Sequence, residues 1–215
     1  MTNITNEDCM ELMSRFPDNH FELAIVDPPY GIKESSRKRE NTVSSKWKNP
    51  KKKIHNTKEW DNEIPSANYF NELFRVSKNQ IVWGANYMVE HLHPSMGWIF
   101  WNKKNGNSDF SDGEFAYTSF KKGSRQFEWL WSGFRKQEPE TRIHPTQKPV
   151  KLYEWLLMNY AKEGDKILDT NLGSGSIAIA CHNLGFDLTA CEIDKDYFDA
   201  AIKRLEQHKA QQRLF

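Results

Sequence analysis

The sequence predicts an α/β protein with a mostly parallel central sheet and helices on both of its faces. Short apolar runs bounded by turn residues recur along the chain, as buried strands do. Stretches with apolar residues at helical spacing lie between these runs. Because parallel strands need long crossover connections, strands that alternate with helices favour a sheet covered on both sides. A length of 215 residues suits one domain with a sizeable core better than two.

The predicted strands are apolar runs such as FELAIVD, in which only one or two polar residues interrupt the run. We expect strands at residues 21–27, 79–87, 97–103, 126–134, 165–170 and 187–194. We expect helices at residues 66–77, 150–162, 174–184 and 197–211. The first helix has its apolar face at Tyr69, Phe70, Leu73 and Phe74, and the second at Leu152, Trp155, Leu156 and Tyr160.

Composition excludes several classes of protein. The three cysteines have neither disulfide nor metal-site spacing, which indicates a reducing compartment. His91 and His93 alternate, but a third ligand is not nearby, so no metal site is expected. The N-terminus does not resemble a signal peptide, and no apolar run is long enough to span a membrane. We therefore expect a soluble, cytoplasmic protein with no membrane partner.

Positive charge is concentrated in one segment. Residues 33–58 include ten basic and two acidic residues, so this segment carries a net charge of +8 and the rest of the chain −7. Its low apolar content predicts a flexible loop. Such runs are commonly solvated surface loops, but clustered lysine and arginine also suit a contact with a polyanion. Trp47 and Trp60 lie beside the basic residues and could stack on a nucleic acid.

The stretch Asp27-Pro28-Pro29-Tyr30 ends the first predicted strand in a carboxylate. Two consecutive prolines remove two backbone donors and fix two φ angles. This stiffening indicates a preorganised group rather than an ordinary turn into a helix. The alternative is a turn in which Asp27 caps a helix and Tyr30 packs.

A second motif lies near the C-terminus, in KILDTNLGSGSIAIACHNLGFDLTACEID. A predicted strand ends at Asp169, a turn with Gly173 and Gly175 follows, and after a helix the next strand ends at Glu192, 23 residues after Asp169. Glycines let the backbone approach a ligand closely, and the second acidic residue suits a ribose diol. The series favours a nucleoside-type cofactor over a purely structural turn. The Gly-Lys-Ser/Thr ending of a phosphate loop is missing, which argues against ATP or GTP hydrolysis.

These two motifs, with HPTQKP (144–149) between them, resemble the S-adenosylmethionine-dependent DNA amino-methyltransferases, which methylate adenine N6 or cytosine N4. The order of the motifs is similar to that of the permuted β group, and the match spans nearly the whole chain. The resemblance implies a Rossmann-like methyltransferase fold with a circularly permuted motif order. It further implies one catalytic domain at 1–215, in which the basic loop at about 31–64 is an insertion that contacts DNA.

The resemblance also assigns roles to residues. Its catalytic residues are Asp27, Pro28, Pro29 and Tyr30: Asp27 and the Pro28 carbonyl accept hydrogen bonds from the target amine, and Tyr30 stacks on the base. Its S-adenosylmethionine-binding residues are Asp8, Cys9, Asp27, Thr146, Lys148, Asp169, Asn171, Gly173, Gly175, Ser176, Glu192 and Ile193. Among these, Asp8 matches the position that reads the cofactor adenine, and Glu192 the one that binds the ribose.

Two departures from the family pattern affect these assignments. Thr170 and Asn171 stand where the family often has Pro-Phe, so part of the cofactor pocket wall must be rebuilt. The piece from Gly133 to Arg142 is too short for the separate target-recognition region of larger relatives. The basic loop is the obvious substitute, with Lys33, Arg37, Lys38, Arg39, Lys46, Lys48, Lys51, Lys52 and Lys53 as the DNA-binding residues.

Several alternatives remain for the substrate. Aspartate at the start of the catalytic motif favours adenine N6, since serine there is associated with cytosine N4. Cytosine in DNA, RNA, or a catalytically idle nucleic-acid-binding module are the other candidates. The resemblance implies DNA as the partner, allows a homodimer, and places the protein in the cytoplasm of a bacterial or phage-infected cell. Residues 101–120 either approach the target base or form turns and core.

Overall fold

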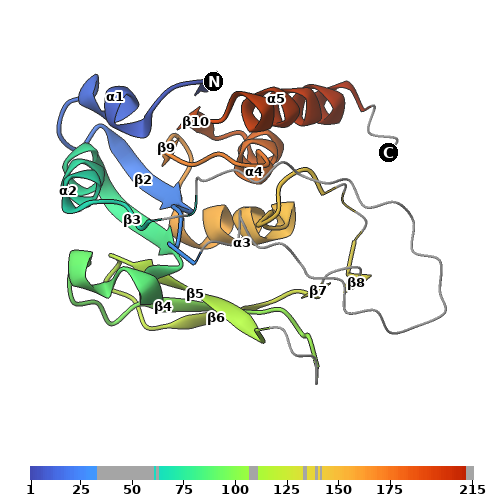
Figure 1. Ribbon diagram of the computed structural model, residues 1–215, viewed down its shortest axis with the longest axis horizontal. Helices are drawn as coiled ribbons and strands as arrows, with labels where there is room; N and C mark the ends of the chain where they lie inside the picture. Colours follow the sequence, from blue (N-terminus) through green and yellow to red (C-terminus); the bar gives the residue numbers. More distant parts are fainter. Residues whose placement is uncertain are drawn as a thin grey trace.

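The computed structural model describes residues 1–32, 61, 63–106, 111–132, 135–138, 140 and 142–211. Within them an eight-stranded sheet has the order β1-β10-β9-β2-β3-β5-β4-β6 (Figure 1). The strands in this order are Thr2–Thr5, Asp187–Cys191, Lys166–Asp169, Phe21–Val26, Ser77–Trp83, Gly113–Thr118, Trp98–Asn102 and Arg125–Glu128.

The sheet is mostly parallel. Strands β1, β10, β9, β2 and β3 run parallel to one another, with pairs such as Leu23 with Ile167 and Ile25 with Ile81. Only β5 is antiparallel to its neighbours in the described sheet, and β6 is parallel to β4. Since the carboxyl ends of parallel strands meet at one edge, β2, β9 and β10 bring the predicted motifs to the same edge.

Helices cover both faces of the sheet (Figure 1). Helices α1 (Cys9–Ser14) and α2 (Ala67–Val76) pack on one face, while α3 (Val150–Tyr160), α4 (Ser176–Leu184) and α5 (Lys195–Ala210) cover the other. From Leu23 to Val26, side chains of β2 belong to both cores, because side chains alternate along a strand. Leu23 and Ile25 belong to the core beneath α3 and α4, and Ala24 and Val26 to the core beneath α1 and α2. The predicted α/β architecture is thus confirmed.

Most predicted elements form, but two strands differ. The strand predicted at 79–87 begins at Ser77 and ends at Trp83, because Gly84 adopts a left-handed conformation (φ 65°). Two short 3-10 helices, Ala85–Tyr87 and Val89–His91, follow it. The strand predicted at 126–134 ends at Glu128, and Trp131–Ser132 (β7) pairs instead with Arg135–Lys136 (β8).

Three elements lack a clear signal in the sequence. Strand β1 and helix α1 are short, and the pattern around them is weak. Strand β5 lies in the stretch at 101–120, for which we expected turns and core or an approach to the base. Its place between β3 and β4 depends on pairings with residues far away in the chain, which local patterns do not encode.

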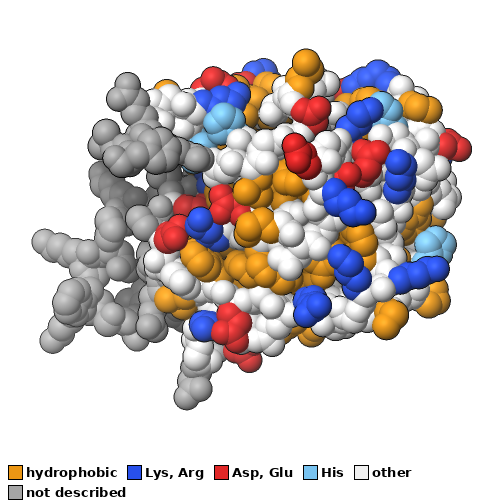
Figure 2. All heavy atoms as spheres, turned by 180° about the vertical axis from the view of Figure 1, so that it is seen from behind, with side chains coloured by type: hydrophobic (Ala, Val, Ile, Leu, Met, Phe, Trp, Pro, Cys, Tyr) orange, Lys and Arg blue, Asp and Glu red, His pale blue; other side chains and the backbone are white. Residues whose placement is uncertain are grey.

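None of the helices in the described ranges is long and apolar enough to cross a bilayer. One face carries hydrophobic side chains near its centre, with lysine, arginine, aspartate and glutamate side chains around them (Figure 2).

Candidate active site

A cavity lies at the carboxyl edge of the sheet, where the three sequence motifs meet. It is lined by residues from the catalytic stretch, the HPTQKP segment, the glycine turn and the end of β10. These residues are Asp27, Pro29, His144, Thr146, Gln147, Lys148, Tyr153, Asn171, Leu172, Gly173, Ser174, Glu192, Ile193 and Tyr197. The convergence places Asp27 and Glu192 on the walls of one cavity, although they lie at opposite ends of the chain.

A second, smaller cavity adjoins the first. It is lined by Glu7, Asp8, Cys9 and Thr170, and it shares Asn171, Glu192 and Ile193 with the first cavity. The shared residues make the two cavities neighbours along the edge of the sheet. The predicted Asp8–Cys9 pair therefore lies beside the predicted ribose-binding residue.

Glu192 is held rigidly between the two cavities. One of its carboxylate oxygens accepts a hydrogen bond from the backbone N–H of Gly173 at 2.8 Å, and the other from that of Asp194 at 2.9 Å. Gly173 has a positive φ of 54°, a conformation that favours glycine. A carboxylate has lone pairs for more than two hydrogen bonds, so a carboxylate in this place suits the two hydroxyl donors of a diol.

Three predicted cofactor residues lie beneath the cavity surface. Asp169 is 2% exposed and accepts a hydrogen bond from the backbone N–H of Asn171 at 2.9 Å. Burial raises the pKa of the Asp169 carboxyl to about 8; the Asn171 N–H opposes this rise, and the charges of Asp27 and Glu192 reinforce it. Gly175 packs closely against α5, since a Cβ there would lie 3.2 Å from Ala201. Ser176 donates a hydrogen bond to the carbonyl of Lys148 at 2.7 Å.

The remaining cofactor candidates have mixed roles. Thr146 lines the first cavity, where its hydroxyl lies 3.1 Å from Nδ1 of His144. Asp8 also caps helix α1, accepting a hydrogen bond from the N–H of Met10 at 2.7 Å. Burial raises the pKa of the Cys9 thiol to about 11, and the neighbouring Asp8 reinforces it, so this cysteine stays a thiol at neutral pH.

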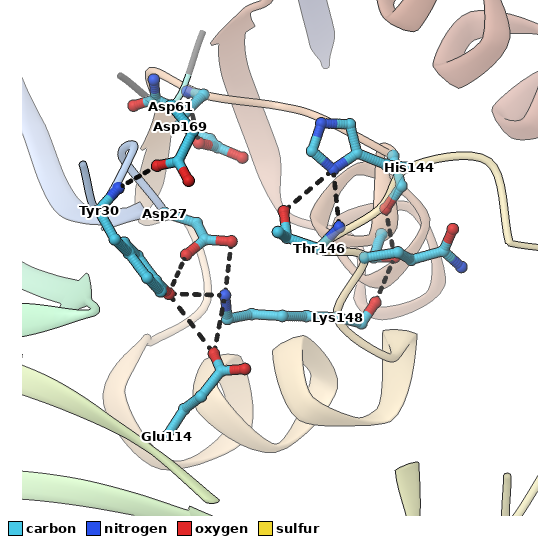
Figure 3. Close-up of polar contacts among 12 residues, drawn as sticks. Asp27, Tyr30, Asp61, Glu114, His144, Thr146, Lys148 and Asp169 are labelled. Atoms are coloured by element: carbon cyan, nitrogen blue, oxygen red, sulfur yellow. Dashed lines mark hydrogen bonds and ion pairs between the residues drawn. The ribbon is translucent and has the colours of Figure 1, made fainter. Parts of the chain in front are cut away.

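Lys148 points toward the catalytic stretch (Figure 3). Its Nζ lies 2.5 Å from Oδ2 of Asp27 and 3.2 Å from Oε2 of Glu114, and it donates to the Tyr30 hydroxyl at 3.1 Å. The Tyr30 hydroxyl in turn donates to Oδ1 of Asp27 at 2.6 Å. Lys103 pairs with the other oxygen of Glu114. Two carboxylates and two ammonium groups therefore form one network that is formally neutral.

The network is largely buried, and the charge of each member shifts the pKa values of the others. The side chain of Lys148 is only 2% exposed; burial lowers its pKa, but Asp27 and Glu114 outweigh this, so the pKa lies above its ordinary value. Burial opposes ionisation of Glu114 too, yet Lys148 and Lys103 hold its pKa at about 2. Burial raises the pKa of the Asp27 carboxyl; Lys148 opposes the rise and Glu114 adds to it.

Tyr30 is fixed at both its backbone and its ring. Asp61 is 2% exposed, and its Oδ1 accepts hydrogen bonds from the N–H groups of Tyr30 and Gly31 at 2.8 Å and 3.0 Å. The Tyr30 ring lies against Gly84 and stacks on Tyr87, with centroids 5.4 Å apart and planes 17° apart. A Cβ on Gly84 would lie 2.1 Å from the Tyr30 ring, so glycine is required there.

Sequence reasoning missed several residues that hold this site together. Glu114, Lys103 and Asp61 surround the catalytic stretch, Tyr153 and Tyr197 line the first cavity, and Glu140 and Arg204 anchor its walls. The sequence gives little sign of these residues, because each stands outside the motifs. An isolated charged or aromatic residue cannot be distinguished in the sequence from others of its type.

Some residues with a predicted role lie outside the part of the chain that the structure describes. The DNA-binding candidates Lys33, Arg37, Lys38, Arg39, Lys46, Lys48, Lys51, Lys52 and Lys53 lie outside the described residues, as do Trp47 and Trp60. Among the residues that the structure does describe, no three histidine, cysteine or acidic side chains are grouped to hold a metal ion.

A mostly parallel sheet with an acid-ended β10, a glycine turn and a proline-stiffened aspartate at one edge defines a Rossmann-like methyltransferase. The family model of the N6/N4 DNA methylases matches residues 69–203. The chain belongs to this family, which confirms the resemblance to S-adenosylmethionine-dependent DNA amino-methyltransferases.

Two curated relatives are type II methyltransferases. The chain is 24% identical to M.BglII of Bacillus subtilis over an alignment of 262 positions, which includes 95% of this chain and 69% of the relative. It is 30% identical to M2.DpnII of Streptococcus pneumoniae over 135 residues, or 60% of this chain and 50% of the relative. The chain thus matches about half the length of M2.DpnII.

Solved structures confirm the predicted fold. The complex of M1.HpyAVI with S-adenosylmethionine is similar, with a TM-score of 0.59 and 20% identity over 95% of this chain and all of that one. The cytosine-N4-specific PvuII DNA methyltransferase has a TM-score of 0.63 and 12% identity, over 100% of this chain and 88% of that one. At such low identity these similarities concern the fold.

Proposed function

We propose that this protein transfers a methyl group from S-adenosylmethionine to the N6 amine of adenine in DNA. The observation that carries the proposal is the position of Asp27, which directly follows β2 and lines the cavity that Glu192 and the glycine turn also line. An acceptor for an amine and a site for a nucleoside thus share one cavity. Membership of a DNA methylase family supports the reaction class.

The residues present fit S-adenosylmethionine. Glu192 would receive the ribose hydroxyls, Asp8 and Cys9 in the adjoining cavity would face the adenine, and the turn at Gly173 would lie along the methionine part. When bound, the cofactor supplies an electrophilic methyl group on a sulfonium. The SAM complex of M1.HpyAVI, which has the same fold, supports this choice of cofactor.

The chain activates the amine by holding two acceptors around it. The lone pair of an exocyclic amine is delocalised into the ring, which makes the nitrogen a poor nucleophile. The Asp27 carboxylate and the Pro28 carbonyl accept hydrogen bonds from the two N–H groups of the amine. These bonds draw the amine nitrogen toward a tetrahedral geometry. Because the prolines stiffen this stretch, the acceptors are preorganised. Burial raises the pKa of Asp27, which suits Oδ of this residue to take the proton that the methylated nitrogen must lose.

A duplex hides the amine, so the target base must be flipped out or arrive single-stranded. The basic segment at about 31–64 is the proposed DNA contact. Support comes from its charge of +8 between Lys33 and Lys58, and from Asp61, which binds the backbone of Tyr30 and Gly31. Ile32 and Asp61, the described residues on either side of 33–60, therefore lie beside the catalytic stretch.

Cytosine N4 in DNA is the second candidate, because the PvuII enzyme with a similar fold is cytosine-N4-specific. The aspartate at position 27 favours adenine, since serine there is associated with cytosine. An RNA amine and an idle nucleic-acid-binding module are further alternatives.

The test is transfer of a tritiated methyl group from S-adenosylmethionine to unmethylated DNA and to RNA, followed by nucleoside analysis. The proposal expects N6-methyladenine in DNA, and N4-methylcytosine would overturn it in favour of the second candidate. Asp27→Ala should abolish transfer and largely spare cofactor binding, measured by calorimetry. DNA binding without any transfer would favour the idle module.

Replacing Lys51, Lys52 and Lys53 with glutamine tests the DNA contact. Each lost phosphate contact should reduce the salt dependence of DNA binding by about one unit of slope. Glutamine at the exposed Lys195, Lys203 and Lys209 of α5 is a matched control that removes equal charge elsewhere. An unchanged slope in the first variant would contradict the contact.

A further inference from the structure

Glu114 faces the catalytic stretch from β5, an element that belongs to none of the sequence motifs. Its Oε2 lies 3.2 Å from Nζ of Lys148 and 3.4 Å from the Tyr30 hydroxyl oxygen, within reach of that hydroxyl as a second acceptor. Figure 3 shows the Lys148 ammonium between this carboxylate and that of Asp27. The same ammonium and the same hydroxyl thus have two alternative acceptors.

Both oxygens of Asp27 are already engaged. Oδ2 binds Lys148 at 2.5 Å, and Oδ1 binds the Tyr30 hydroxyl at 2.6 Å. Each oxygen keeps lone-pair capacity for a further bond, but these two donors draw on its charge, so Asp27 accepts an amine more strongly once they move to another acceptor. Displacing Lys148 would be costly if it had no second partner, because an ammonium left unpaired in a buried site is strongly destabilising.

Glu114 removes that cost. Its contacts to Lys148 and Tyr30 are 0.7 Å and 0.8 Å longer than those of Asp27, so a small movement of the two donors would exchange the partners. Lys103 holds the other oxygen of Glu114, and the two lysines keep the pKa of Glu114 at about 2, so the carboxylate is charged and ready to accept.

We propose that Glu114 is a positioning residue that takes over Lys148 and Tyr30 when the target amine engages Asp27. The inference rests on the proposed function, since it requires an amine at Asp27. Glu114 itself does not touch the amine. Its role is to free Asp27 as an acceptor while every buried charge keeps a partner.

Glu114→Gln keeps the size of the side chain and removes its charge. Lys148 then has Asp27 as its only charged partner in the described network and stays on it. Methyl transfer at saturating DNA and cofactor should fall about 10- to 100-fold, while the dissociation constant of S-adenosylmethionine, measured by calorimetry, stays within about threefold. Glu114→Asp keeps the charge and should recover part of the rate.

The double variant Glu114→Gln/Lys148→Met separates this role from a structural one. Removing the lysine removes the donor that holds Asp27, so at saturating S-adenosylmethionine the double variant should be more active than Glu114→Gln alone. Two independent losses would instead multiply, and the double variant would then be the slowest. Multiplicative losses would overturn the proposal.

The pH dependence gives a second readout. Lys148→Met leaves Asp27 and Glu114 as two neighbouring carboxylates, which raises the pKa of one of them. Its transfer rate should therefore rise with pH more steeply than that of the wild type, and adding Glu114→Gln should remove the difference. Identical profiles in the two variants would contradict the proposal.

The outcomes also separate this inference from the proposed function. If the wild type transfers a methyl group to an amine but the losses of Glu114→Gln and Lys148→Met multiply, only the exchange at Glu114 is overturned. No transfer by the wild type, despite cofactor and DNA binding, overturns both.

Discussion

The guanidinium of Arg204 lies 2.7 Å from the carboxylate of Glu140 and joins the last helix to the segment before HPTQKP. Arg204 also donates to the Ser174 carbonyl and the Ser176 hydroxyl, both at 2.9 Å. Glu140 accepts the N–H of Val150 at 3.2 Å, at the start of α3. One ion pair thus ties together the glycine turn, α5 and the entry of α3, which form one wall of the cavity.

Glu140→Gln should destabilise the protein by about 2–3 kcal/mol, because it leaves the Arg204 guanidinium largely buried without its counter-charge. The two side chains are each 14% exposed. Urea unfolding measures the loss. Asp199→Asn is the matched control, since its pair with Lys195 is 58–65% exposed and should contribute less than about 0.5 kcal/mol. Equal effects of the two variants would show that the buried pair has no special role.

Gly84→Ala should reduce methyl transfer strongly, because its Cβ would lie 2.1 Å from the Tyr30 ring and push it out of place. Gly185→Ala is the control: Gly185 has a similarly positive φ, 76° against 65°, but no atom within 4 Å of its Cβ. Backbone strain should cost both variants about 1–2 kcal/mol, measured by thermal unfolding. Only Gly84→Ala should also lose methyl transfer. Equal transfer rates in Gly84→Ala and Gly185→Ala would contradict the role of Tyr30 packing.

Asp61→Ala should lower the rate of methyl transfer about tenfold or more, because the N–H groups of Tyr30 and Gly31 lose a buried charged acceptor. Asp61→Asn keeps one acceptor oxygen and should fall between this variant and the wild type. Cofactor affinity should hardly change, since Asp61 is not among the residues that line the two cavities. The exposed Asp112→Ala serves as the control, and a loss of transfer there as large as in Asp61→Ala would discredit the explanation.

The unfolding free energy should depend on the protonation of Asp169. Its pKa is about 8 in the folded protein, against an ordinary value of 3.8, mainly because of burial. The folded state therefore binds more protons than the unfolded state between these values, and its stability falls as pH rises, by at most about 1.4 kcal/mol per pH unit.

Asp169→Asn keeps the acceptor for the Asn171 N–H and removes the titration. The variant should gain stability over the wild type progressively between pH 5 and pH 8 (about the window set by these values), as measured by urea unfolding at each pH. A difference between the two proteins that stays constant over this range would rule out Asp169 as the group that titrates.

Local sequence determined the main elements of the fold and two of its motifs. Runs such as 21–27 and 165–170 are apolar enough to be buried on both faces, which already predicts parallel strands between two helical layers. Asp27 and Glu192 each end such a strand, so the rule that parallel strands share a carboxyl edge predicts that they meet. The glycine turn between them carries its own conformational signal.

Tertiary structure alone decided the partners of the charged residues. Nothing near Lys148 in the chain predicts that its ammonium binds Asp27. Glu114 and Asp61 look like ordinary surface charges until the fold brings them to Lys148 and to the backbone of Tyr30. The cause is physical: a charge in water needs no partner, whereas a buried charge must have one. Which residues become buried depends on pairings between strands far apart in the chain, such as β3 with β5, and a single sequence does not encode those locally.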